Sequence, residues 1–153
     1  MTRIEASVVI NRPVAEVWKF VSDLPNNAPK WNIWRGTRGV IYVQQTSTGP
    51  FGVGTTIQSR WSTRPHVLES RITEYEPGQR FATEITSPQM MKESKEIVSL
   101  EDIEGKTKMN AIWELKFTGL YRLLAPFQVG SLRSFNEARI GNVKRILESQ
   151  AGQ

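Results

Sequence analysis

Two polar residues, Asn136 and Arg139, interrupt the apolar face of a predicted C-terminal helix, and their types and spacing could do chemistry. They lie about one turn apart, within the apolar stripe. A guanidinium can bind a carboxylate, phenolate or enolate, and an amide adds a directional hydrogen bond. Such groups orient ligands in otherwise apolar pockets. The structural alternative is a salt bridge from Arg139 to a strand carboxylate such as Glu84, because an unpaired buried charge is costly.

Catalytic motifs are few in this sequence. His66 is the only side chain that titrates near neutrality, so acid–base chemistry would use it or a carboxylate with a raised pKa. It follows Pro65 at the start of a predicted strand, which indicates a surface position. No Gly-x-Ser-x-Gly motif is present, and the glycine-rich residues 49–54 lack the Gly-Lys-Ser/Thr ending of a phosphate-binding loop. We therefore name no catalytic residue.

Composition excludes further classes of site. The chain has no cysteine and one histidine, which excludes disulfides and thiolate nucleophiles and leaves no cluster for a metal, so we expect no metal and no cofactor. Its 153 residues suit a single domain over residues 1–153. No apolar run approaches the ~20 residues of a membrane span, and no signal-peptide pattern opens the chain. We expect a cytoplasmic protein without stable membrane insertion.

The net charge of +5 raises the possibility of an anionic partner such as nucleic acid. The basic residues are scattered, however, with acidic residues between many of them, which is typical of a solvated surface. We expect no nucleic-acid partner, and the sequence leaves the oligomeric state open.

The elements that must position these residues follow from the hydrophobic period. Residues 3–11 alternate as a half-buried strand, and a short amphipathic helix follows Pro13. The Pro- and Asn-rich residues 23–29 predict a break, after which a further helical turn runs up to Trp31. A period of two then predicts strands at 39–45, 55–62, 66–75, 80–86, 92–103 and 106–118. Residues 126–150 form the long helix, with an apolar face of Val129, Leu132, Phe135, Ile140, Val143, Ile146 and Leu147.

This order predicts an α+β fold in which a curved antiparallel sheet of about seven strands wraps around the long helix. A strongly curved sheet does not close tightly on a helix, so we expect a cavity between them. The walls of this cavity would come from strand and helix residues, namely Trp61, Trp113, Phe81, Phe117, Leu132 and Phe135.

Four segments together carry a family resemblance. They are the opening strand with residues 11–18, the glycine-rich residues 49–55, residues 73–81, and the helix end at 142–148. In their order and spacing they resemble the START-like (SRPBCC) superfamily, and within it the polyketide cyclase/dehydrase-like proteins. The resemblance implies a helix-grip fold with a deep cavity for a hydrophobic small molecule. It also implies that Trp31 and Trp34 lie near the cavity mouth.

The leading prediction is a binding protein or carrier for a small hydrophobic ligand, such as a lipid, an isoprenoid or an aromatic polyketide. Arg139 and Asn136 would orient the ligand, while residues 49–54 and Trp31 would form the mouth. The alternative is a cofactor-free cyclase or dehydratase, in which Arg139 holds an enolate and a carboxylate or His66 moves a proton. A third hypothesis is an interaction domain without chemistry.

Overall fold

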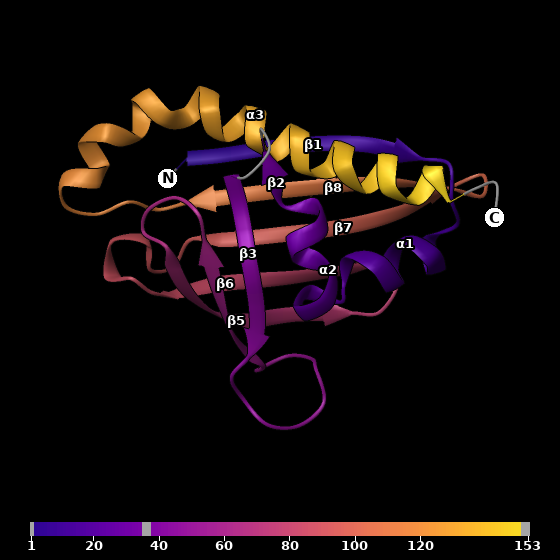
Figure 1. The fold of residues 1–153 in the computed structure, drawn as a ribbon, viewed down its shortest axis with the longest axis horizontal. Helices are drawn as coiled ribbons and strands as arrows, with labels where there is room; N and C mark the ends of the chain where they lie inside the picture. Colours follow the sequence, from indigo (N-terminus) through magenta and orange to yellow (C-terminus); the bar gives the residue numbers. More distant parts are fainter. Residues whose placement is uncertain (1, 35–37, 151–153) are drawn as a thin grey trace.

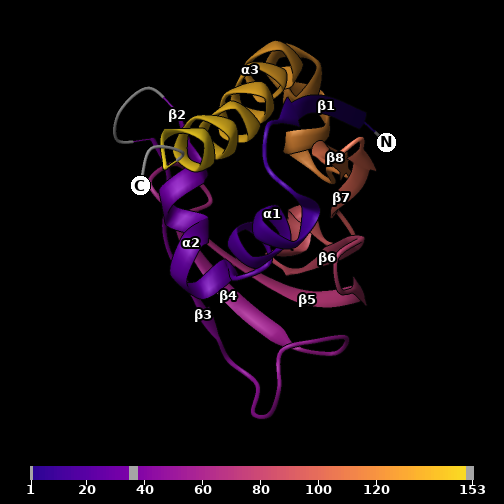
Figure 2. The same ribbon diagram turned by 90° about the vertical axis from the view of Figure 1, so that its right-hand side faces the viewer.

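In the computed structural model, which describes residues 2–34 and 38–150, an eight-stranded antiparallel sheet curls around one long helix (Figures 1 and 2). Residues 1, 35–37 and 151–153 of the expected single domain lie outside the described residues. The elements in chain order are β1 (Thr2–Ile10), α1 (Val14–Val21), α2 (Leu24–Trp31), β2 (Ile33–Trp34), β3 (Arg38–Gln45), β4 (Thr56–Trp61), β5 (Val67–Glu76), β6 (Arg80–Ser87), the 3-10 helix η1 (Gln89–Met91), β7 (Lys95–Ile103), β8 (Lys106–Leu115) and α3 (Leu120–Ser149).

The sheet is a meander that its first strand completes. Strands β2 to β8 pair with their neighbours in chain order, and β1 pairs with β8, so that β1 and β2 form the two edges. Figure 2 shows the sheet as an open curve, with α1 and α2 on its inner side and α3 between its two ends. Helix α3 packs along β1 (Figure 1). The α+β helix-grip architecture expected from the sequence is thus confirmed.

Several boundaries differ from the predicted ones for local reasons. The two-residue strand β2 was missed because so short a strand shows no period. Helix α2 begins at Leu24, inside the predicted break, because the Asp23 side chain accepts from the backbone N–H of Asn26 and Pro25 falls in the first turn, where its missing N–H costs nothing. Helix α3 begins at Leu120, so Pro126 lies within it.

The predicted apolar face of α3 meets the sheet as expected. Phe135, Ile140, Val143 and Leu147 are buried, and the other residues of that face are partly buried. The C-terminal half of α3 shares one large core with α1, α2 and the middle of the sheet. A second, smaller cluster joins Phe135, at the middle of α3, to Ile4, Trp113 and Leu115 of the sheet. The two clusters divide the interior beneath α3.

None of the helices in the described parts of the chain combines the length and apolar character that a bilayer crossing requires. The cytoplasmic location and the lack of a nucleic-acid partner stay predictions.

Candidate ligand-binding site

A cavity of about 470 Å³ lies between the concave face of the sheet and the two helices α2 and α3. Pockets that hold drug-sized molecules span roughly 300–1,000 Å³, so the interior is not packed solid and has room for a small ligand. The helix side of the wall is largely apolar, with Leu24 and Ala28 from α2 and Leu132 and Phe135 from α3. The exposed residues Thr63, Arg64 and Gln128 form part of the rim.

Arg139 projects into this wall and is 1% exposed. Its Nη2 forms an ion pair with Glu96 Oε2 on β7. Its Nη1 donates to Asn32 Oδ1 at 2.6 Å, and its Nε donates to Asn136 Oδ1 at 2.8 Å. Asn136, itself fully buried, donates to the backbone oxygen of Ala111 on β8 at 3.0 Å. The guanidinium therefore ties α3 to α2 and β7 directly, and to β8 through Asn136.

The partner of Arg139 is a strand carboxylate, as the structural alternative supposed, but it is Glu96 and not Glu84. Glu96 shares its face of β7 with the buried residues Val98 and Leu100. Glu84 does not line the cavity and pairs with Arg71 and Lys95 at 3.6 and 4.0 Å. Glu96 lies opposite Thr83 on β6, and Glu84 is the next residue along that strand, so alternation turns the two carboxylates to opposite faces of the sheet.

Two tryptophans flank the guanidinium. Its central carbon Cζ lies 4.5 Å from the ring centroid of Trp113 and 5.1 Å from that of Trp31, which is the geometry of cation–π interactions. Burial lowers the pKa of Arg139, and the Glu96 carboxylate acts in the opposite direction by favouring the charged form. Two aromatic faces, two amide oxygens and one counter-ion thus surround the buried cation.

Glu96 is the more accessible member of the pair, because its side chain is 19% exposed. Its Oε2 also accepts a hydrogen bond from Trp113 Nε1 at 2.5 Å. Both contacts use the same oxygen, and within residues 2–34 and 38–150 no hydrogen bond reaches Oε1. The site thus presents a charge-neutral ion pair with one carboxylate oxygen still able to accept.

Asn32 holds its place through the end of α2 and the start of β3. Its Nδ2 donates to Ala28 O at 2.9 Å, which directs Oδ1 toward Arg139. Val40 N donates to Asn32 O at 2.9 Å. Gly39 has a φ of +142°, and a Cβ built there would lie 2.0 Å from Asn32 O. Only glycine fits this close approach.

Six of the nine predicted site residues line the cavity: Trp61, Trp113, Phe117, Leu132, Phe135 and Arg139. Asn136 supports Arg139 from behind the wall. Trp31 and Phe81 are fully buried in the main core and do not line the cavity, so the expected position of Trp31 at the mouth is corrected. Both are apolar residues on inward faces, and the sequence does not indicate which inward residues border a space.

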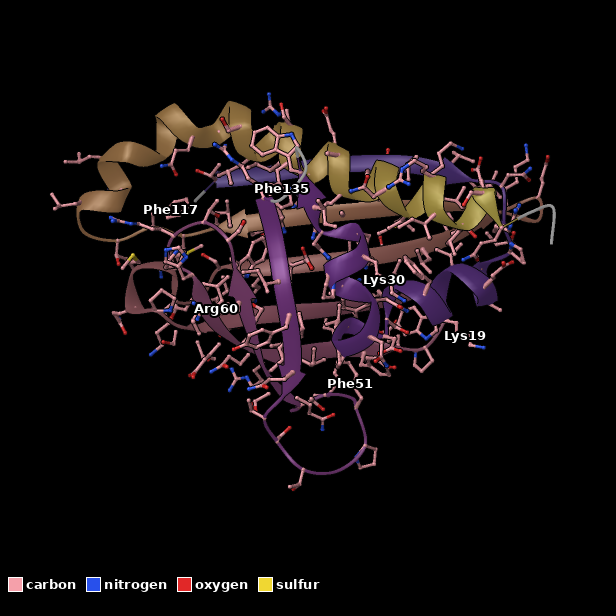
Figure 3. All side chains as sticks on the ribbon, viewed as in Figure 1. Lys19, Lys30, Phe51, Arg60, Phe117 and Phe135 are labelled. Carbon is pink, nitrogen blue, oxygen red and sulfur yellow. The ribbon has the colours of Figure 1, made fainter. Side chains whose placement is uncertain are left out.

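The loop at residues 49–54 was expected to gate the cavity, but it contributes nothing to its lining. Its Phe51 packs against Tyr75 at a ring-centroid distance of 5.8 Å. Figure 3 shows Phe51 on this loop, away from Phe117 and Phe135. Residues 63–65, Met91 and Gln128 take part in the lining instead.

His66 is exposed and outside the cavity lining, with Nδ1 3.3 Å from the backbone oxygen of Trp61. It is therefore not placed to exchange protons with a ligand. Across the described parts of the chain, no three His, Asp or Glu side chains gather in a group that could hold a metal ion.

The sequence analysis missed nine polar residues of the lining, namely Asn32, Ser59, Thr63, Arg64, Ser70, Thr83, Lys95, Glu96 and Gln128. For the two serines a signal was present, because each occupies the inward phase of its strand between apolar neighbours. Ser59 lies between Ile57 and Trp61 in this phase. A polar residue within an apolar alternation is the strand counterpart of Arg139 on its helix.

Comparisons with known proteins agree with this architecture. A family model described as polyketide cyclase/dehydrase and lipid transport matches residues 1–148. A Thermus thermophilus protein has a TM-score of 0.74 at 12% identity, over 97% of this chain and 99% of that one. A Nitrosospira multiformis protein has a TM-score of 0.72 at 10% identity, over 99% and 100% of the two chains. A Rhodobacter sphaeroides protein has a TM-score of 0.70 at 15% identity, over 97% and 93%. At these identities the likeness concerns the fold, and none of the curated proteins matches the chain.

Proposed function

Because the chain belongs to the polyketide cyclase/dehydrase and lipid transport family, we propose that it binds and carries a small, largely apolar molecule in the cavity beneath α3. The observation that supports this most directly is the cavity of about 470 Å³, whose wall is mostly apolar. Aliphatic and aromatic side chains such as Leu132 and Phe135 supply affinity by removing apolar ligand surface from water. The buried polar cluster supplies orientation.

The charge state of that cluster favours an uncharged ligand. Anion binding was one of the two roles considered for Arg139, but its charge is offset by Glu96 and its guanidinium is closed in by Trp31 and Trp113. An anionic group near it would also meet the Glu96 carboxylate. A hydroxyl group, in contrast, can donate to Glu96 Oε1 without adding charge to the cavity.

Native mass spectrometry of the purified protein, with extraction and identification of any copurified molecule, tests the proposal directly. Binding is then followed with N-phenyl-1-naphthylamine, an uncharged apolar probe that fluoresces when it leaves water. We expect Leu132→Trp, which fills the cavity from α3, to weaken probe binding at least about tenfold, since a filled site cannot accept the same volume. Ser131→Trp places the same side chain on an exposed position of α3 and should leave binding unchanged. An unmodified protein that binds no probe would refute the proposal.

A second candidate, the cofactor-free cyclase or dehydratase, is favoured by one observation. Glu96 places a carboxylate oxygen inside the cavity, where it can take a proton from a bound molecule. Incubation with a linear poly-β-keto thioester, followed by mass detection of water loss, tests this reaction. A Glu96→Gln variant that still binds but no longer forms the product would support it, whereas turnover unchanged in that variant would exclude Glu96 as the base.

A further inference from the structure

We propose that a row of hydroxyl groups on the sheet side of the cavity forms a second polar subsite, which binds a hydroxyl or keto oxygen remote from the Arg139–Glu96 pair. The inference rests on the proposed function, because it concerns the same ligand in the same cavity. The row consists of Ser59 on β4, Ser70 on β5 and Thr83 on β6. It meets Glu96 on β7, so four neighbouring strands each contribute one polar side chain.

The strand register places these residues along one line. Ser59 pairs with Leu68, and Ser70 is the next inward residue along β5. Ser70 in turn pairs with Ile85, and Thr83 is the next inward residue of β6 in the same direction. Thr83 lies directly opposite Glu96. The row therefore crosses the sheet diagonally and ends at the ion pair.

The hydroxyl groups keep unused hydrogen-bonding capacity. Ser70 is only 8% exposed, yet across the described residues no hydrogen bond reaches its Oγ, and none reaches Thr83 Oγ1. Ser59 Oγ accepts from Trp61 Nε1 at 3.0 Å, and its own proton has no acceptor within those residues. Neither Ser70 Oγ nor Thr83 Oγ1 is fully cut off from solvent, so both hydroxyl groups face the cavity and can exchange water for a bound ligand. A ligand oxygen at each position would satisfy them.

The two walls together define the class of ligand. Neighbouring strands lie about 4.8 Å apart, so the row from β4 to β7 covers roughly 14 Å measured along the sheet. The helix wall opposite offers mainly apolar contacts from residues such as Leu132 and Phe135. The ligand that fits both is uncharged and elongated, with an apolar body and at least two separated hydroxyl or keto groups. A hydrocarbon chain with one polar end would leave the row unpaired.

Three rigid competitors that differ only in their hydroxyl groups test the inference against N-phenyl-1-naphthylamine: 5α-androstane, 5α-androstan-3β-ol and 5α-androstane-3β,17β-diol. We expect the diol to displace the probe about fivefold more strongly than the mono-ol, the gain of one neutral hydrogen bond. Ser70→Ala and Thr83→Val should each reduce that difference, measured as the ratio of the diol and mono-ol affinities within each variant. Ser99→Ala, on β7 but outside the cavity lining, is the matched control and should preserve the difference.

The outcomes separate this inference from the proposed function. A protein that binds the probe but shows the same affinity for mono-ol and diol would overturn the subsite and leave the carrier function standing. Equal displacement by the diol in Ser70→Ala, Thr83→Val and the unmodified protein would do the same. A protein that binds neither probe nor steroid would overturn both. Thermal melting of each variant establishes that the compared proteins are folded.

Discussion

Removal of the Arg139 charge should destabilise the protein far more than the loss of a surface salt bridge would. Arg139→Met keeps most of the stem that packs between Trp31 and Trp113 but deletes the guanidinium. Glu96 then remains as a carboxylate without its counter-ion, and Asn32 and Asn136 each lose a donor. The variant therefore removes one charge and leaves three polar groups incompletely paired.

The magnitude follows from the burial of the two partners. Breaking a fully buried ion pair by removing one member costs about 3–5 kcal/mol. Glu96 is 19% exposed toward the cavity, so part of its charge regains water, and we expect about 3 kcal/mol. For a chain of 153 residues this corresponds to a Tm lower by roughly 6–12 °C. A loss of this size would show that Arg139 links α3 to Asn32 and β7 as a buried ion pair, because a surface salt bridge contributes only about 0–1 kcal/mol.

Chemical denaturation of a double-mutant cycle measures the effect. Glu96→Gln alone leaves the guanidinium without a carboxylate and should also destabilise. The double variant, Arg139→Met with Glu96→Gln, removes both charges and should recover at least about 1.5 kcal/mol relative to the sum of the single changes. Arg145→Met, on an exposed position of the same helix, should remain within about 0.5 kcal/mol of the unmodified protein. An Arg139→Met variant as stable as this control would refute the reasoning.

Two further predictions concern Gly39, which adjoins Asn32 of the cavity wall, and Glu148, near the C-terminal end of α3. Gly39→Ala should lower the free energy of unfolding, measured by urea titration, by at least about 2 kcal/mol, because its Cβ would lie 2.0 Å from Asn32 O. Gly141 on α3 has open space around the position of a Cβ. Gly141→Ala should therefore raise the free energy of unfolding by up to about 1 kcal/mol in the same titration. The hydrogen bond from Lys144 lowers the pKa of Glu148 below its ordinary value of 4.5, so this carboxylate stabilises the fold above that pH and ceases to do so as the pH falls through the lowered pKa. Glu148→Gln should therefore melt slightly earlier than the unmodified protein at neutral pH and together with it in strong acid; an equal difference at both pH values would contradict this assignment.

Hydrophobic periodicity was enough to predict the architecture and the inward position of two polar residues on the long helix. Asn136 and Arg139 occupy apolar phases of a long helix, and both are buried as that phase required. Short hairpin connections fixed the antiparallel order. These patterns can be recognised from the sequence because they repeat within a few residues of the chain.

The partners of Arg139 could not be predicted in the same way. Asn32 is 107 residues away in the chain, and its amide reaches Arg139 only because α2 ends against β3 at Gly39. Glu96 did show an inward phase with Val98 and Leu100, yet Glu84 was the carboxylate named. Alternation along β6 places Glu84 on the face opposite to that of Phe81, so periodicity already argued against it. Which inward carboxylate reaches Arg139 depends on the assembled sheet.

The sequence also did not indicate which inward residues would lie in the core and which would border the cavity. Trp31 and Trp61 are both large apolar residues on inward faces, but Trp31 is enclosed by the core and Trp61 borders the cavity. The difference arises from how far the sheet curves away from the helices at each point. Side-chain type alone carries no information about that separation.

The cross-link from α3 to α2 and β7 through Arg139 has a consequence for how such a binding site can diversify. The contacts that join these elements lie in the wall of the cavity itself. A substitution there would change the shape of the cavity and the stability of the fold at the same time. Ser70, Thr83 and the rim at residues 63–65 carry no such obligation. In proteins that evolve from this chain, a change of ligand should therefore arise from substitutions at Ser70, Thr83 and residues 63–65, while Arg139 and Glu96 are retained.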